Sequence, residues 1–338
     1  MTKGELIDAI EFIKTITSKK IINSFLLRLS YFVSRTLNIY LHWGKIESLS
    51  IEPTNLCNLK CPECPSGNNS MTRSRVFLAI NNFEDAINQA GTHLAYLQLF
   101  FQGEPFLHPK IYDFINFAAK KNIYTSTSTN GQFLTVTNCE KIVKSGLHRL
   151  IISVDGSTQD VYEKYRVGGS LDLVLNGISE LINTKNKLKS RTPFVIMQFV
   201  VFATNEHQLP DIKKLAKALK VDKLEIKTAQ IENFEMGSPL IPKNKKYSRY
   251  LPSKNGKFQL NRTQNFKCKR IWNGAVISAE NKFLPCCFDK NAEYPYNQQS
   301  NKIINDIWKG NKAVEFRKLV WNKENQIEMC KNCTEGLK

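Results

Sequence analysis

Three cysteines on one short loop are the residues of this 338-residue chain best suited to chemistry. Cys57, Cys61 and Cys64 follow a C-x3-C-x2-C spacing, on a loop that also carries Pro62 and Pro65. Thiolates this close in sequence can converge on one metal site, and a [4Fe–4S] cluster normally takes four of them. Three would leave one iron open to a substrate or cofactor. A structural zinc site needs a fourth ligand, so zinc completed by a remote ligand is the alternative.

A second group of cysteines lies near the C-terminal end of the sequence. It includes a C-x2-C pair, which is a chelating spacing, and its members are Cys268, Cys286, Cys287, Cys330 and Cys333. Four thiolates also make a standard structural zinc site, so the residues alone leave zinc and iron–sulfur open. Cys139, in a predicted helix, is expected to be a buried apolar residue.

The first cysteine loop resembles the signature of the radical S-adenosylmethionine superfamily. The run at 51–64 reads IEPTNLCNLKCPEC. In that family the three cysteines bind three irons of a [4Fe–4S] cluster, and S-adenosyl-L-methionine chelates the fourth. The resemblance implies one-electron cleavage of that cofactor to a 5′-deoxyadenosyl radical, which abstracts hydrogen from the substrate. It also implies a low-potential electron donor of the flavodoxin or ferredoxin type.

Four further motifs resemble cofactor-binding elements of the same family. They are Gly-Glu-Pro at 103–105, Thr-Asn-Gly at 129–131, a serine at the end of the next strand, and an arginine after it. The resemblance implies that the cofactor is surrounded by Gly103, Glu104, Asn130, Ser153 and Arg166. Taken singly, each has a simpler interpretation as a turn or a surface arginine. Their order along the chain favours the cofactor.

The segment from Cys268 to Asp289 and the closing Cys-x2-Cys resemble the SPASM or Twitch extension of many radical enzymes. That extension holds auxiliary iron–sulfur clusters. A full SPASM domain has more cysteines than the five found here, so the resemblance implies one auxiliary [4Fe–4S] cluster. Its expected ligands are Cys268, Cys286, Cys330 and Cys333. Cys286 is favoured over Cys287 because it directly follows a proline.

From Ile46 onward, predicted strands alternate with helices. The alternation indicates an α/β fold with a parallel sheet, and the motifs fall at strand ends, where barrel enzymes carry their sites. We therefore expect a partial (β/α)6 TIM-like barrel with N-terminal helices and a small C-terminal cysteine-rich domain. The predicted strands are 49–51, 94–101, 123–127, 150–154, 194–201 and 224–227; the predicted helices are 111–121, 138–145, 172–182, 209–219 and 303–320.

The sequence divides into four parts: an amphipathic helical segment, the barrel, a Gly-, Pro- and Lys-containing linker, and the cysteine-rich domain. Their predicted bounds are 1–45, 46–235, 236–262 and 263–338. Arg28 and Arg35 make a membrane-spanning helix in the first part improbable. That segment is expected to pack on the main domain, with contact to a membrane surface or a partner as the alternative.

The charge balance favours an anionic partner. The formal net charge is +18, and residues 236–338 contribute +12 from 20 Lys and Arg against 8 Asp and Glu. The basic surface suits an acidic peptide, a phosphorylated metabolite, an acidic redox protein or a membrane face; a solvated lysine-rich face is the alternative. No nucleic-acid-binding motif stands out, so no nucleic acid is expected. Nine cysteines without a secretory leader favour a cytoplasmic protein, free or membrane-associated.

The expected function is radical chemistry on an unidentified substrate. An auxiliary cluster could accept an electron from a substrate radical, which favours oxidation or cross-linking of a peptide, a protein side chain or a small metabolite. A non-catalytic iron–sulfur electron carrier is the second hypothesis, because it would need the clusters without a pocket for S-adenosyl-L-methionine.

Overall fold

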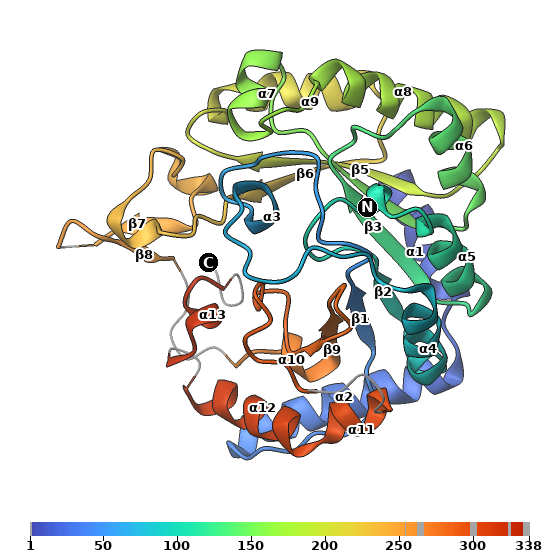
Figure 1. Cartoon of the computed structure of the whole chain (residues 1–338), viewed down its shortest axis with the longest axis vertical. Helices are drawn as coiled ribbons and strands as arrows, with labels where there is room; N and C mark the ends of the chain where they lie inside the picture. The colour runs from blue at the N-terminus through green and yellow to red at the C-terminus, as the bar shows by residue number, and fades with distance from the viewer. Residues whose placement is uncertain (1, 254, 262–266, 298–302, 324–325, 334–338) are drawn as a thin grey trace.

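The computed structural model describes residues 2–253, 255–261, 267–297, 303–323 and 326–333. Its centre is an eight-stranded sheet in the order β10-β9-β1-β2-β3-β4-β5-β6 (Figure 1). The strands are β1 (Ser48–Ile51), β2 (Tyr96–Gln98), β3 (Tyr124–Thr129), β4 (Arg149–Ser153), β5 (Phe194–Val201), β6 (Lys223–Thr228), β9 (Gly274–Ile277) and β10 (Phe283–Leu284).

All pairs from β1 to β6 are parallel, and helices connect successive strands. Crossover helices are the usual way to join parallel strands. This confirms the predicted α/β class and the partial barrel. The α-helices up to β6 are α1 (Lys3–Lys14), α2 (Ser18–Leu37), α3 (Pro65–Asn68), α4 (Ile80–Ala90), α5 (Ile111–Lys120), α6 (Val136–Lys144), α7 (Gln159–Tyr165), α8 (Leu171–Lys187) and α9 (Leu209–Ala218).

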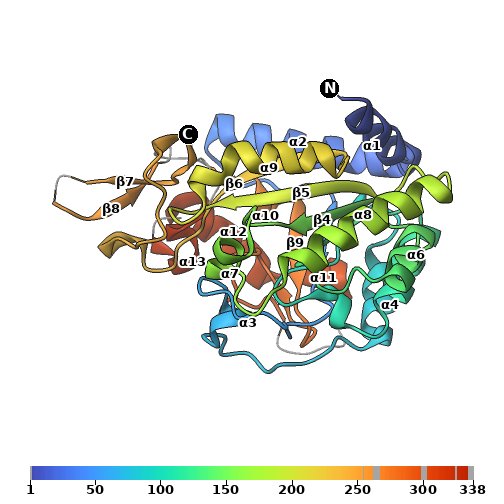
Figure 2. The ribbon, with the colours of Figure 1, turned by 90° about the horizontal axis from the view of Figure 1, so that it is seen from above.

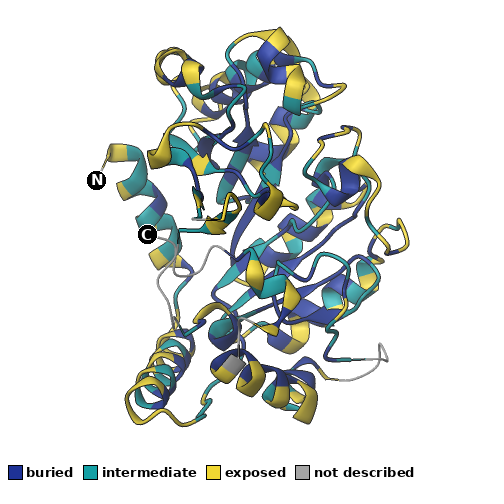
Figure 3. Ribbon diagram, turned by 90° about the vertical axis from the view of Figure 1, so that its left-hand side faces the viewer, coloured by how far each residue is buried: buried dark blue, intermediate teal, exposed yellow. Residues whose placement is uncertain are grey.

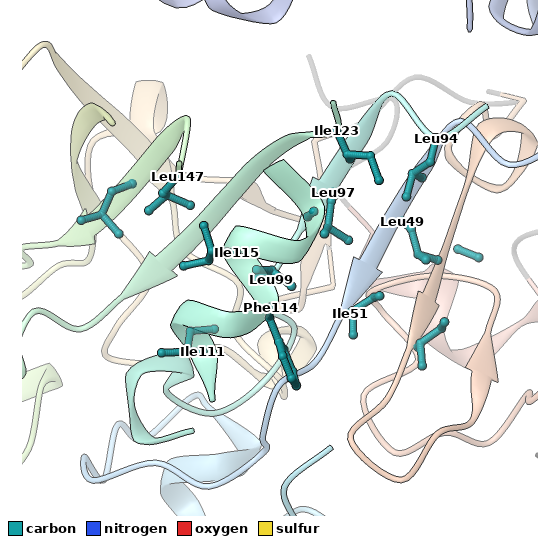
Figure 4. Close-up of a cluster of buried hydrophobic side chains, with 14 of the residues drawn as sticks. Leu49, Ile51, Leu94, Leu97, Leu99, Ile111, Phe114, Ile115, Ile123 and Leu147 are labelled. Atoms are coloured by element: carbon teal, nitrogen blue, oxygen red, sulfur yellow. The ribbon is translucent and has the colours of Figure 1, made fainter. Parts of the chain in front are cut away.

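The core forms between the sheet and the helices that cover its outer side. In β1, Leu49 and Ile51 are fully buried in this core, while Ser48 and Ser50 line a cavity on the other side of the sheet. This alternation follows from the two-residue period of a strand. Figure 4 shows Leu49 and Ile51 beside Leu97 and Phe114, which come from β2 and α5. Buried residues are concentrated in the central strands (Figure 3).

The C-terminal region continues the barrel sheet instead of lying apart from it. β9 pairs in parallel with β1, and β10 pairs antiparallel with β9. The order of pairing could not be predicted, because parallel partners need no proximity in sequence. The expected helix at 303–320 is two helices, α11 (Ile304–Lys309) and α12 (Asn311–Lys323), separated at Gly310. α10 (Arg270–Asn273) and α13 (Glu328–Lys331) complete this region.

The stretch predicted as a linker has structure of its own. It contains an antiparallel hairpin of β7 (Tyr250–Pro252) and β8 (Phe258–Leu260). Tyr250 is buried and stacks on Phe234 at 4.6 Å between ring centroids. Part of the predicted linker, 262 and 254, lies outside the described residues.

The N-terminal segment forms two helices, where the sequence indicated helix as far as about residue 45. α2 ends at Leu37, and Asn38 follows in the left-handed region, φ 52°, as a C-cap. In Figure 2, α1 and α2 lie along one side of the molecule, and α3 lies on the opposite side. Among the described residues, no helix has the length and apolar character needed to cross a membrane.

Candidate active site

The first three cysteines lie on the loop that leaves the carboxyl end of β1 and leads into α3. Cys61 is buried, and Cys57 and Cys64 are half-buried. The loop is held by its own backbone: the N–H of Cys64 donates to the Cys61 carbonyl at 3.2 Å, and that of Gly67 donates to the Cys64 carbonyl at 2.8 Å. Burial raises the pKa of the Cys57 thiol, and raises that of Cys61 to about 11.

The Gly-Glu-Pro turn after β2 packs directly on this cysteine loop. Gly103 has φ +74°, and a Cβ there would lie 2.5 Å from the Thr54 carbonyl oxygen and 2.7 Å from that of Leu56. The Gly103 N–H donates to Ser66 Oγ at 3.1 Å, and the Glu104 N–H donates to the Leu56 carbonyl at 2.8 Å. Only glycine combines this backbone conformation with so close an approach.

Glu104 connects the end of β3 to the cysteine loop through hydrogen bonds. Its buried carboxylate accepts hydrogen bonds from the Asn130 N–H at 2.7 Å and the Thr129 hydroxyl at 2.8 Å. Asn130 Nδ2 in turn donates to Asn58 Oδ1 at 2.8 Å and lies 3.9 Å from Cys57 Sγ. Burial raises the pKa of Glu104 to about 7. The carboxylate therefore positions Asn130 beside the cysteine loop.

Arg166 reaches the cysteine loop from the end of α7. Its guanidinium pairs with Asp155 at 2.6 Å, and Nη1 lies 3.9 Å from Cys61 Sγ. Only 15% of its side chain is exposed, so the surface-arginine interpretation is wrong. Ser153, the last residue of β4, is buried and pairs in register with Gln198 of β5. Three of the four sequence motifs thus contact the cysteine loop, and the fourth, Ser153, lies at the carboxyl end of β4.

A buried ion pair, which the sequence analysis missed, joins this loop to the C-terminal region. Arg73 donates to both carboxylate oxygens of Glu52, at 2.7 and 2.8 Å, and both side chains are essentially inaccessible to solvent. Glu52 also accepts from the N–H groups of Gln102 and Ala279, and Arg73 Nε donates to the Lys290 carbonyl at 2.8 Å. Glu52, a charged residue directly before Pro53 in the cysteine motif, was the feature of the sequence that could have indicated this ion pair.

The second cysteine group is distributed over three segments. Cys286 and Cys287 hydrogen-bond to each other, and Cys268 is close enough to affect the pKa of Cys286. Arg270 Nη1 lies 3.1 Å from Cys287 Sγ. The hydrogen bond with Cys286, and then the Arg270 charge, lower the pKa of Cys287 below its usual range. Cys330 and Cys333 share one turn at α13, where the Cys333 N–H donates to the Cys330 carbonyl.

A cavity and a lysine lie beside the second cysteine group. The cavity, of about 130 Å³, is lined by Ser50 and Gln98 of the sheet together with Arg270, Cys286 and Cys287. The Lys290 side chain is within electrostatic range of both Cys64 and Cys287, and it was not predicted as a site residue.

The thiols present suit iron–sulfur ligation. The nine cysteines are present as thiols, and none is consumed in a disulfide. Within the described ranges, no three His, Cys, Asp or Glu side chains are gathered to hold one metal ion. A cluster spreads its thiolates over several irons, so its ligands need not meet at a single point. The ligand assignments, including Cys286 over Cys287 and iron–sulfur over zinc, remain predictions. Cys139 is fully buried in α6, as expected.

Two family models match the chain. The radical SAM superfamily model matches residues 51–216, and the SPASM model, an iron–sulfur cluster-binding domain, matches residues 268–334. Together they include both cysteine groups and all the strand-end motifs.

Curated relatives match at low identity. A PqqA peptide cyclase of Rhodopseudomonas palustris is 26% identical over 181 residues, covering 53% of this chain and 46% of the relative. A probable GTP 3′,8-cyclase of Methanocaldococcus jannaschii is 26% identical over 174 residues, covering 51% and 56%. The chain thus spans about half the length of these relatives. A PqqA peptide cyclase of Bradyrhizobium diazoefficiens matches more of the chain, 84%, at 23% identity over 305 residues and 77% of its own length.

Solved structures share the fold. SuiB of Streptococcus suis bound to S-adenosylmethionine superposes with a TM-score of 0.63 at 14% identity, covering 91% of this chain and 76% of SuiB. BtrN in complex with AdoMet and 2-DOIA gives a TM-score of 0.53 at 17% identity, covering 87% and 95%. At these identities the similarity establishes the architecture alone.

Proposed function

This chain belongs to the radical S-adenosylmethionine superfamily and carries a C-terminal SPASM domain, and we propose that it is an enzyme that cleaves S-adenosyl-L-methionine reductively to abstract hydrogen from a substrate. The observation that carries the proposal is the convergence of three chain segments on one cysteine loop. Gly103, Asn130 and Arg166 each contact the loop from the end of a different strand or helix.

In this proposal Cys57, Cys61 and Cys64 hold the catalytic [4Fe–4S] cluster and leave one iron for the cofactor. Held by these cysteines, the cluster would supply one electron for cleavage of S-adenosyl-L-methionine to methionine and a 5′-deoxyadenosyl radical. The positively charged guanidinium of Arg166 and the Asn130 amide lie next to Cys61 and Cys57, where they can stabilise thiolates.

The strand ends would form the rest of the cofactor site. Gly103 lets the turn backbone approach the loop, and Glu104 fixes Asn130 through its backbone N–H. The Asp155 carboxylate holds Arg166 in place by their ion pair. Ser153, at the end of β4, completes the proposed set on the side of β5.

The substrate is proposed to be an anionic peptide, with a small anionic metabolite as the alternative. Arg270 lines the cavity and lies 3.1 Å from Cys287 Sγ, and Lys290 is within electrostatic range of Cys64 and Cys287. The match to a PqqA peptide cyclase along 84% of the chain supports a peptide. The Cys268, Cys286, Cys330 and Cys333 cluster would lie beside the cavity, which Cys286 lines, and could accept the electron of a substrate radical.

The test is anaerobic reconstitution with iron and sulfide, followed by dithionite and S-adenosyl-L-methionine. We expect 5′-deoxyadenosine from the parent chain and background amounts from Cys57→Ala. Cys139→Ala is the matched control, because it removes a buried thiol of α6 that is remote from the loop. Equal product from Cys57→Ala and the parent would refute the catalytic assignment.

Binding of S-adenosyl-L-methionine distinguishes the proposed enzyme from a non-catalytic electron carrier. The reconstituted carrier would not bind S-adenosyl-L-methionine at equilibrium, whereas the proposed enzyme does and loses the binding in Cys57→Ala. For the substrate, a fluorescent acidic peptide mixture should bind the parent more tightly than Lys290→Gln, and a basic mixture should bind neither. Equal binding of acidic and basic mixtures would contradict the anionic assignment.

A further inference from the structure

Helix α2 packs on the protein through its polar side. Its most buried residues fall at helical spacing, and four of the five are polar: Lys20, Asn23, Leu27, Ser30 and Ser34. Polar residues normally face solvent on a surface helix, so this orientation is the reverse of the usual one.

Each of these polar residues has a specific partner. Lys20 Nζ donates to the Asn122 carbonyl at 2.6 Å, and Asn23 exchanges two hydrogen bonds with the backbone of Lys45. Ser30 Oγ accepts from Trp272 Nε1 at 3.2 Å. Buried polar groups are costly unless they are paired, and these are paired. The orientation of α2 is therefore fixed by hydrogen bonds from its polar residues to other parts of the fold.

The opposite side of α2 presents large apolar side chains to solvent. Ile21, Phe25 and Phe32, at spacings of four and seven, have exposed fractions of 60, 62 and 65%. α1 continues the pattern with Leu6 and Ile13. Among the described residues, eighteen large hydrophobic side chains are exposed, and ten of them lie between residues 6 and 43. Exposed apolar residues this concentrated indicate a binding surface.

The charged side chains of α2 are all cationic, whereas α1 also carries Glu5, Asp8 and Glu11. No Asp or Glu occurs from 12 to 46, while the same stretch carries Lys14, Lys19, Lys20, Arg28, Arg35 and Lys45. Lys14, Lys19, Arg28 and Arg35 are exposed. Arg28 and Arg35 lie three residues after Phe25 and Phe32, on the same side of α2. Apolar side chains bordered by cations match the headgroup and acyl boundary of an anionic bilayer.

The surface lies at the end of the sheet remote from the cysteine loop. Helix α2 contacts Asn122, Lys45 and Trp272, which precede β3, β1 and β9 in the sequence. It therefore lies at the amino ends of these strands. The cysteine loop leaves the carboxyl end of β1, and Figure 2 shows α3 on the side opposite α1 and α2. A bilayer on this surface would leave the cysteine loop open to the aqueous phase.

We propose that the outer side of α1 and α2 docks this protein on an anionic lipid bilayer, in the plane of the interface. The apolar side chains enter the headgroup region, and the lysines and arginines bind the lipid phosphates. The bilayer is a docking surface, not the source of the substrate, because the candidate active site faces away from it. This inference is independent of the proposed reaction.

The experiment is flotation of the full reconstituted chain with two kinds of vesicle. One is pure phosphatidylcholine, and the other contains about 30% phosphatidylglycerol. We expect binding to the anionic vesicles, weakened when sodium chloride rises from about 0.1 M to about 0.5 M. Phe25→Ser with Phe32→Ser should reduce the bound fraction at least tenfold. Arg28→Gln with Arg35→Gln should remove the preference for anionic lipid.

The matched control is Val136→Ser with Leu173→Ser, which changes two apolar residues of similar exposure, 66 and 57%, on α6 and α8. It should float like the parent. All variants should keep the parent's melting transition and 5′-deoxyadenosine yield, so loss of flotation is separable from loss of fold or reaction. Absence of binding to either vesicle overturns the proposal, as does parental flotation of the phenylalanine variant. If the parent is a dimer in solution and the phenylalanine variant is a monomer, the surface binds a second copy of this chain, and the lipid proposal is also overturned.

Discussion

The first cysteine group occupies eight residues of one loop, whereas the second is drawn from three segments between 268 and 333. The first loop is fixed by hydrogen bonds within itself and by Gly103, Asn130 and Arg166 from neighbouring strand ends. The second depends on β9 pairing with β1 and includes two cysteines of the separate helix α13 region. The first site can thus be predicted from a local sequence motif, whereas the second forms only when the C-terminal region packs on the sheet.

Removing the first three thiolates gives the largest contrast between the two groups. The Cys57→Ala, Cys61→Ala, Cys64→Ala triple variant should lose about four irons per chain and retain about four with matching sulfide. Iron, sulfide and zinc analysis of the reconstituted protein checks this. If the triple variant contains zinc and no sulfide, the second cysteine group holds a structural zinc ion and not an auxiliary cluster.

A methyl group at Gly103 should disrupt the first group only. In Gly103→Ala the new Cβ meets the Thr54 and Leu56 carbonyls, so the loop must move, and we expect S-adenosyl-L-methionine affinity to fall at least tenfold. Gly168→Ala is matched in backbone, with φ +83°, but nothing lies within 4 Å of its Cβ. It should cost only about 1 kcal/mol of stability and leave binding unchanged. Equal affinities in the two variants would show that the turn does not shape the site.

Breaking the Glu52–Arg73 pair should affect both groups at once. Arg73→Met leaves a buried, unpaired carboxylate, and the free energy of unfolding should fall by about 3–5 kcal/mol. Urea unfolding measures it, and Lys144→Gln, which removes an exposed pair with Glu140, should change it by less than about 0.5 kcal/mol. The double variant Glu52→Gln, Arg73→Met should recover part of the loss. A single variant as stable as the parent would contradict the linking role.

The last prediction is a pH dependence of stability that is confined to the first group. Burial raises the pKa of Glu104 from 4.5 to about 7. A raised carboxyl pKa gives a stability contribution that is complete below pH 4.5 and is lost as the pH rises through 7. Relative to the parent, Glu104→Gln should therefore gain about 3 kcal/mol of unfolding free energy between pH 4.5 and pH 8. A parallel pH dependence of the two proteins would show that Glu104 ionises normally.

Much of the barrel could be predicted because its signals are local. Strand β5 was predicted with its observed bounds, and the motifs at 103–105 and 129–131 were expected at strand ends, where they are found. Hydrophobic runs and turn residues carry this information within a few positions. The break at Gly310 and the hairpin at Tyr250 were missed, because continuous helical periodicity hid the first and the short strands of the second show little periodicity.

What the sequence determined by itself is the chemistry available: three thiols on one loop, a second set of five, and the order of the strand-end motifs. The tertiary structure alone decided which groups meet. Glu52 and Arg73 are 21 residues apart, β1 and β9 more than two hundred, and α2 faces outward with its apolar side because its polar residues found partners elsewhere in the fold. Such pairings depend on which surfaces exclude water together, and no local pattern of residues records that.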